Sequence, residues 1–334
     1  MGLNPPKVEP IRANRVNGPG LPPGGGWAHN SPVMKSLLPC LLLVVWVAAT
    51  PVSPARASAP PAGSPPAEPK QVLMKEGVKN AYPHWSRDGS RILFQSNRAG
   101  KWQLFVMNAD GSNEKQLTRG DSNNDRADWS PDNRSIAFVS DRDGNEEIYV
   151  MGTDGTGARN LSKHPASDIH PYWSPDGKKV LFNSTRDVDR YQIYEVNPDG
   201  TGLRRLVVSG DDDTCARVSP AGDRILYLTN ITGGADDVMV RDRDGSHPRN
   251  ITSDSPADGW PTWTPDGRHI VFASRRGPAF ALFVMNPDGS QARPITNPPE
   301  PYFDGRPNVS RDGKRIVFNR ESGDTIGILT VELR

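Results

Sequence analysis

Trp173-Ser174-Pro175-Asp176-Gly177 is one of six recognisable copies of a short motif that recurs along the chain. Successive copies are 44, 44, 45, 45 and 46 residues apart, measured between the anchor positions Trp85, Trp129, Trp173, Val218, Trp263 and Val309. A regular period of this length is typical of proteins that stack small structural units or arrange them in a ring. The spacing therefore predicts a repeat protein. It disfavours most enzyme classes, because the repeated residues serve a structural unit.

Each copy contains four short apolar segments separated by turn signals. In the third copy, Val180 and Phe182 share one face at the two-residue period of a β-strand. Asp-Gly dipeptides mark the chain reversals, because glycine accepts the positive φ that tight hairpins require. No segment has the length and the i, i+3, i+4 spacing of a helix. The repeat unit is therefore predicted to be a four-stranded antiparallel β-meander.

Six such sheets predict an all-β fold, a six-bladed β-propeller that spans residues 71–334. A four-stranded sheet cannot bury both of its faces alone, and radial packing of the sheets around an axis solves this problem. A linear solenoid is the alternative, but it would leave its end sheets uncovered. The last copy has three strands, and the segment Lys70–Leu73 resembles Lys115–Thr118, the fourth strand of the first copy. We therefore expect the N-terminal strand to complete the last blade and close the ring.

Residues 34–57 have the pattern of a secretory signal peptide. Lys35 supplies the positive start, residues 37–49 form an apolar core, and the small residues around Arg56 suit cleavage after Ala57. An uncleaved signal anchor is the alternative, although the apolar core is short for a membrane span. The pattern predicts a periplasmic or secreted protein.

The remaining N-terminal residues show no folding pattern. Residues 1–33 are rich in proline and glycine and are interpreted as a non-native upstream extension. Residues 58–70 are rich in proline, alanine and serine, which predicts a disordered tether.

Charge and cysteine content exclude several classes of protein. The chain has 40 basic and 39 acidic residues, a net charge of +1, and no clustered excess that would favour nucleic acid. After the expected cleavage Cys215 is the only cysteine, so no internal disulfide is expected. We expect a monomeric propeller without a cofactor, which contacts a membrane only through a partner or an uncleaved signal.

The order of the motifs in residues 71–334 resembles the propeller repeats of the TolB family. The matching stretches are Trp129-Ser130-Pro131-Asp132, Ser140-Asp141-Arg142, Ile148-Tyr149-Val150-Met151 and Asn286-Pro287-Asp288-Gly289-Ser290. The resemblance implies a periplasmic component of the Tol–Pal envelope system that binds a protein partner, such as an envelope lipoprotein. The expected tether at 58–70 is too short for the α/β domain that precedes the propeller in TolB.

Searches for catalytic and metal-binding patterns find little. The sequence has no Gly-x-Ser-x-Gly elbow and no Cys or His pair with zinc spacing. The segments 141–144 and 242–245 read Asp-Arg-Asp-Gly, which would suit calcium, but they lack the twelve-residue ligand pattern of a specific calcium loop. Solvated turns explain them better, because Asp and Gly are favoured in turns for backbone reasons alone, and a calcium ion in the channel is kept as an alternative.

Two positions of each repeat point to a candidate site. Aspartates recur five residues ahead of the anchor, and mostly polar or aromatic residues lie three ahead of it. The first strand of each blade should line the central channel, so these side chains are expected at the mouth nearest the strand starts. The predicted partner-binding residues are Arg126, Asp168, His170, Asp213, Arg217, Asp258, Trp260, Asp304 and Arg306. Alternatively, the aspartates cap turns and bond backbone N–H groups between blades.

Three functions agree with this pattern. The first is a non-enzymatic exported scaffold that binds a protein or peptide at the channel mouth. The second is a small hydrolase or lyase that acts on a polar polymer there, which requires His170 to converge with Asp168 or Asp213. The third is a structural envelope component, which would have no pocket at the mouth.

Overall fold

The computed structural model describes residues 67–207, 209, 211–230 and 236–333. The expectations for residues 1–33, for 34–57 and for most of 58–70 lie outside these residues. Every regular element among the described residues is a β-strand. None of them belongs to a helix long and apolar enough to cross a membrane.

The strands form six four-stranded antiparallel sheets. The first strands of the sheets are β2 (Asn80–Trp85), β6 (Asn124–Trp129), β10 (Asp168–Trp173), β14 (Asp212–Val218), β18 (Asp258–Trp263) and β22 (Phe303–Val309). The second strands are β3 (Arg91–Ala99), β7 (Ser135–Ser140), β11 (Val180–Ser184), β15 (Arg224–Asn230), β19 (Ile270–Ser274) and β23 (Arg315–Ser322). The third strands are β4 (Lys101–Asn108), β8 (Glu147–Gly152), β12 (Gln192–Val196), β16 (Asp236–Asp242), β20 (Ala281–Met285) and β24 (Thr325–Glu332). The fourth strands are β5 (Lys115–Gln116), β9 (Arg159–Asn160), β13 (Arg204–Arg205), β17 (Arg249–Asn250), β21 (Arg293–Pro294) and β1 (Lys70–Leu73).

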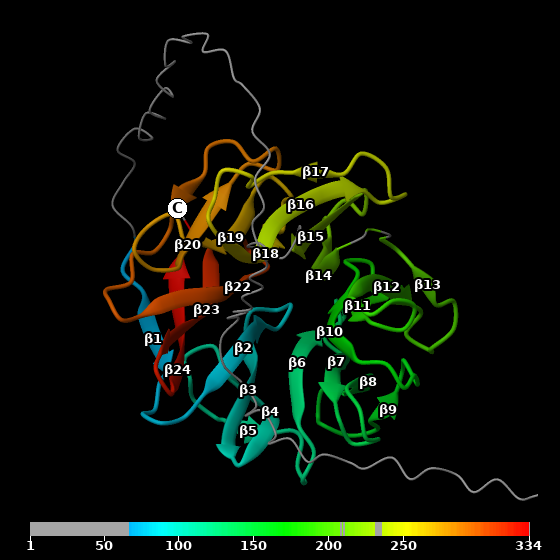
Figure 1. Ribbon diagram of the computed structural model, residues 1–334. Helices are drawn as coiled ribbons and strands as arrows, with labels where there is room; N and C mark the ends of the chain where they lie inside the picture. The colour runs from blue at the N-terminus through cyan, green and yellow to red at the C-terminus, as the bar shows by residue number, and fades with distance from the viewer. Residues whose placement is uncertain (1–66, 208, 210, 231–235, 334) are drawn as a thin grey trace, which may run out of the picture. The chain divides into compact units, whose positions relative to one another are not determined.

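The sheets are the blades of a six-bladed propeller, as the repeat predicts. Figure 1 shows them around a central axis, with β2, β6, β10, β14, β18 and β22 innermost. The second strand of a blade is buried on both faces: in β11, Leu181 and Phe182 point to opposite faces and each is only 1% exposed. Burial on both sides follows because each blade packs between two neighbours.

Each first strand carries one extra residue at the same place. The pairing of β10 with β11 slips between Ile169 and Tyr172, and the five other blades slip at the equivalent position. The residues at these bulges all have a left-handed backbone, with φ between 47° and 55°: Tyr82, Arg126, His170, Cys215, Trp260 and Arg306. None of these is glycine, so the strained conformation is enforced by the packed blades.

The turn after each anchor is fixed by side chains. In the third blade, the Ser174 hydroxyl donates to Asp176 at 2.6 Å, and Gly177 takes the positive φ of 72° that the turn needs. Asn133 replaces this glycine in the second blade and adopts φ 58°. Its side-chain oxygen accepts the backbone N–H of Arg87 at 2.8 Å. That N–H exists because the first blade has Arg87 where four other blades have proline.

Strand β1 is the outer strand of the sixth blade. It pairs antiparallel with β24 and places Lys70 opposite Thr330. The glycine of the third hairpin in the first blade, Gly111, lies close to the carbonyl of Val72 in β1: an added Cβ would be 2.8 Å away. Gly155 lies equally close to the carbonyl of Leu117, at 2.6 Å. Strand β1 therefore offers the first blade the same surface that the first blade offers the second.

We predict that β1 is needed to stabilise the ring. A protein without residues 58–75 should aggregate or lose roughly 10 °C in Tm, because the edge of β24 becomes exposed and several kcal/mol of stability are lost. A protein that lacks only residues 58–66 is the control and should melt like the parent protein. Equal melting temperatures for the two truncated proteins would rule out this role for β1.

Candidate functional site

The four aspartates expected at the channel mouth are buried inside their blades. Asp168, Asp213 and Asp304 are 0% exposed and Asp258 is 4% exposed. Asp168 accepts a hydrogen bond from Arg186 at 2.8 Å, and Asp304 accepts two from Arg320 at 2.7 and 2.9 Å. The prediction that these four aspartates line an open mouth is therefore wrong, because they are enclosed by groups of their own blades.

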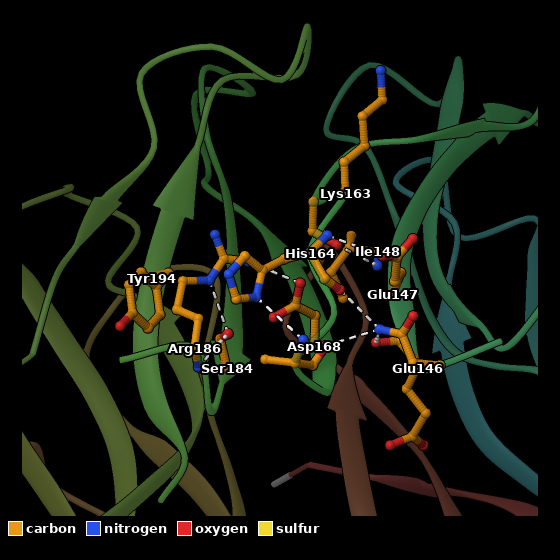
Figure 2. A network of polar contacts seen from close by, with 12 residues as sticks. Glu146, Glu147, Ile148, Lys163, His164, Asp168, Ser184, Arg186 and Tyr194 are labelled. Carbon is orange, nitrogen blue, oxygen red and sulfur yellow. Dashed lines mark hydrogen bonds and ion pairs between the residues drawn. The ribbon is translucent and has the colours of Figure 1, made fainter. Parts of the chain in front are cut away.

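The arginine that binds Asp168 comes from the Ser-x-Arg motif of the repeat. Figure 2 shows Arg186 between Asp168, Ser184 and the Tyr194 ring. The guanidinium carbon lies 5.0 Å from the centre of the Tyr194 ring, and the Ser184 hydroxyl accepts a hydrogen bond at 2.9 Å. The motif therefore ties the first strand of the blade to its second and third strands.

Asp213, like Asp258, has no arginine bound to its carboxylate in the described part of the protein. Burial raises its pKa to about 6, against hydrogen bonds from Ser209 and Thr229. Asp211 raises the pKa further, and Arg241 lowers it. At neutral pH the Asp213 carboxylate is therefore ionised although it is buried, and its charge destabilises the folded protein.

We predict that Asp213→Asn stabilises the protein at pH 8. The pKa in the folded state is above the unfolded value of 3.8, so ionisation destabilises the fold as the pH rises through about 6. The gain in unfolding free energy should reach at most roughly 3 kcal/mol at pH 8 and vanish towards pH 4. Asp168→Asn is the matched control and should destabilise at pH 8, because it leaves Arg186 without its carboxylate. Denaturant unfolding at several pH values would show this, and a loss of stability in Asp213→Asn at pH 8 would contradict it.

The residues at the six bulges come together in the channel. The Tyr82 hydroxyl lies 3.5 Å from His170 Nε2, although these residues belong to the first and third blades. The guanidinium carbon of Arg306 lies 4.4 Å from the centre of the Tyr82 ring and 4.5 Å from that of Trp260. Arg126 and Arg306 each pair with a carboxylate nearer the blade, Glu146 at 2.9 Å and Glu321 at 2.7 Å. These side chains lie together across the channel, at the level of the six bulges.

His170 does not meet the requirement for a hydrolase. Burial and the charges of Arg126, Arg306 and Arg217 hold its pKa well below the usual range, so it is neutral. Asp168 is bound to Arg186, and Asp213 accepts from Ser209 at 2.7 Å. The expected convergence of His170 with either aspartate is absent from the described residues.

A cavity of about 240 Å³ opens at the other end of the first strands, where each leads into its turn. We call this cavity the funnel. Its floor includes the residues just before the anchors, Asp128, Tyr172, Arg217, Thr262 and Asn308. Its rim consists of the second residue after each anchor: Arg87, Pro131, Pro175, Pro220, Pro265 and Arg311. Of the predicted partner-binding residues, only Arg217 lines the funnel.

The lining of the funnel has three positive charges, from Arg87, Arg217 and Arg311, against one negative charge, from Asp128, a net +2. None of these guanidinium groups has a hydrogen bond or ion pair to any described residue. The Arg217 carbon stacks 3.8 Å from the centre of the Tyr172 ring. Burial lowers the pKa of Arg87; Asp128 opposes the shift and Arg311 adds to it. The like charges of Arg87 and Arg311 therefore lie close enough to act on each other.

Both oxygens of Asp128 are already engaged. His84 Nδ1 lies 3.0 Å from one oxygen, and the Trp173 backbone N–H donates to the other at 2.9 Å. Burial raises the Asp128 pKa, but the hydrogen bond and charge of His84, with Arg217 and the Trp173 amide, outweigh it and leave the pKa below its ordinary value. Asp128 is therefore ionised and internally bound, so it leaves the arginines available to a ligand.

Sequence reasoning missed Arg87 and Arg311. The available signal was the absence of proline in the turns of the first and sixth copies, which are neighbours once the ring forms. The described residues contain no group of three or more His, Cys, Asp or Glu side chains suited to a metal ion, so we assign no ligands to a channel calcium.

Comparison with known families agrees with this architecture. The family model of the TolB β-propeller domain matches residues 67–162 and 127–244, together more than half of the protein. The chain belongs to the TolB β-propeller domain family. The resemblance noted in the sequence is thereby confirmed for the propeller.

Solved TolB structures share the fold. A putative TolB from Agrobacterium tumefaciens has a TM-score of 0.61 and 21% identity, over 80% of this chain and 99% of that one. TolB from Acinetobacter baumannii has a TM-score of 0.60 and 18% identity, over 75% of this chain and 65% of that one. An oligogalacturonate lyase in complex with manganese has a TM-score of 0.53 and 16% identity, over 80% of this chain and 97% of that one. At these identities the likeness shows the fold alone.

A curated relative matches a shorter stretch. The uncharacterized peptidase YuxL of Bacillus subtilis (strain 168) is 38% identical over 65 residues, which are 19% of this chain and 10% of that protein. The matches thus span less than two thirds of this relative and of the A. baumannii TolB.

Proposed function

We propose that this protein is a non-enzymatic exported scaffold that binds a protein or peptide partner at the funnel. The observation that carries the proposal is the set of three guanidinium groups in the funnel, Arg87, Arg217 and Arg311, with no hydrogen bond or ion pair to a described residue. A ligand that supplies acceptors can pair with these groups, and the pairing is strongest for the half-buried Arg87 and Arg217. A rigid ring of loops around one axis also suits recognition.

The presence of a cavity supports a binding role over a purely structural one. A purely structural component needs no pocket, whereas the funnel has a volume of about 240 Å³. Similarity to proteins named TolB makes an envelope partner a reasonable candidate, and a lipoprotein of a Tol–Pal system is the most specific form of this proposal.

The second candidate is a lyase or hydrolase. The observation that favours it is the His84–Asp128 pair at 3.0 Å beside Arg217, since an aspartate can orient a histidine as a general base. The similarity to an oligogalacturonate lyase suggests the substrate to try. Release of an unsaturated product from oligogalacturonate by the parent protein, and its loss in His84→Ala, would establish this activity in place of the scaffold role.

We predict that filling the funnel abolishes partner capture. Pro175→Trp with Pro220→Trp adds two bulky neutral side chains at the half-buried rim, without touching the arginines. An envelope protein retained by the parent protein should be lost by this variant. Leu203→Trp is the control: Leu203 is 45% exposed and is not part of the funnel lining, so capture should persist. Mass spectrometry of the retained proteins is the readout, and capture by the filled variant would move the site elsewhere.

We also predict export. N-terminal sequencing of the native protein should give a start near Ser58, and fractionation should place the protein outside the cytoplasm. These residues lie outside the described part of the protein. A protein that retains residues 34–57 and sediments with membranes would indicate an anchor instead.

A further inference from the structure

The funnel offers a ligand the hydrogen-bond donors of its three arginines. Trp85, Trp173 and Trp263 also belong to the lining, but their indole N–H groups are enclosed, without a hydrogen-bond partner among the described residues and out of reach of a ligand in the cavity. The one carboxylate there, Asp128, already uses both of its oxygens. A ligand that fits this environment brings acceptors and negative charge, and a carboxylate matches the fork of a guanidinium group best.

The funnel also continues outwards. A second cavity of about 520 Å³ lies between the fifth and sixth blades, where its lining includes His269, Val284 and Leu333. We call it the groove. The groove and the funnel share Thr264, Pro265 and Arg311 in their linings. The two cavities therefore adjoin at Arg311, which suits an extended ligand better than a compact one.

The charges of the groove differ from those of the funnel. Hydrogen bonds lower the pKa of Asp266, first from Thr264, and the pKa of Asp312, first from Ser310, so both carboxylates are ionised. The groove lining also contains the guanidinium groups of Arg293 and Arg311, so its charges balance. The funnel lining, in contrast, has a net charge of +2. A second negative charge therefore gains less in the groove than in the funnel, and a peptide with one carboxylate followed by polar residues fits both parts.

We propose that the occupant is an extended peptide segment that places one carboxylate among Arg87, Arg217 and Arg311 and continues through the groove past Asp266 and Asp312. The carboxylate belongs either to an acidic side group of the peptide or to its C-terminus. This inference rests on the proposed function, since it names the chemistry recognised at the same funnel.

Peptide pools of defined charge test it. Acetylated and amidated heptapeptides with Glu, Gln or Lys fixed at the centre, and non-acidic residues mixed elsewhere, are passed over the immobilised protein. A fourth pool has central Gln and a free C-terminal carboxylate. Retention of the Glu pool should exceed that of the Gln pool by roughly tenfold. Preference for the fourth pool instead assigns the carboxylate to the C-terminus of the peptide, and equal retention of all four pools overturns the inference.

Two sets of variants link the preference to the arginines. Replacement of Arg87, Arg217 and Arg311 by Gln should abolish it. The control replaces three exposed arginines outside the funnel, Arg119, Arg159 and Arg249, by Gln and changes the net charge equally. Arg311 is exposed, so Arg311→Glu alone should fold normally and shift retention from the Glu pool towards the Lys pool. A Glu preference that survives in both funnel variants overturns the inference.

The groove has its own test. An all-Glu heptapeptide or an acidic sugar oligomer should be retained no better than the single-Glu pool, and Asp266→Asn with Asp312→Asn should increase the retention of these polyanions. Stronger retention of the acidic sugar oligomer by the parent protein would assign the site to a polyanion. Partner capture that is blocked by the filled funnel but unchanged by the arginine-to-glutamine variant would leave the proposed function standing and refute the carboxylate.

Discussion

The fold depends on one constraint at the channel: each first strand has an edge with no neighbouring strand, so its backbone groups need other partners. The bulge residues meet it with a left-handed backbone that turns one N–H towards the preceding blade. At three junctions a side-chain amide accepts it: Asn319 accepts from Tyr82 at 3.1 Å, Gln95 from Arg126 at 2.7 Å and Asn183 from Cys215 at 3.2 Å. Single directed bonds thus join these blades at the axis, and the strained backbone is tolerated because packing on both sides enforces it.

This constraint divides the channel into two unlike ends. At the starts of the first strands, the aspartates are buried within the blades, as Asp168 is beside Arg186, and are therefore closed to a ligand. At the ends of the strands, the turn after each anchor satisfies itself through its own serine or threonine and aspartate, as Ser174 and Asp176 do. The turn itself therefore does not use the side chain of its second residue. Charge at that position, as in Arg87 and Arg311, is available for recognition.

The repeat made the fold predictable. Six copies with strand-like alternation and Asp-Gly turns leave few ways to bury the faces of the sheets other than a propeller. The candidate site was harder to predict. The aspartate pattern was real, but the partner of Asp168 is Arg186, 18 residues later and just beyond the end of the adjacent strand, and only the strand register brings them together. Sequence also does not show which end of the channel is open. Arg217 was found because it lies on a first strand, whereas Arg87 and Arg311 lie on turns and appear only as missing prolines.

The two missing prolines lie where the ring closes, and this position links stability to recognition. Proline in one turn packs against the glycine of the next blade: an added Cβ on Gly177 would lie 3.7 Å from Pro131. The junctions that follow Arg87 and Arg311 lack this contact and use polar or cationic ones. Asn133 accepts the Arg87 amide, and the Arg315 guanidinium lies 4.6 Å from the centre of the Trp85 ring. The directed contacts at these junctions come from the backbone of Arg87 and from the side chain of Arg315. The side chains of Arg87 and Arg311 are therefore not needed to close the ring. Replacing them can change the charge of the funnel without changing its shape.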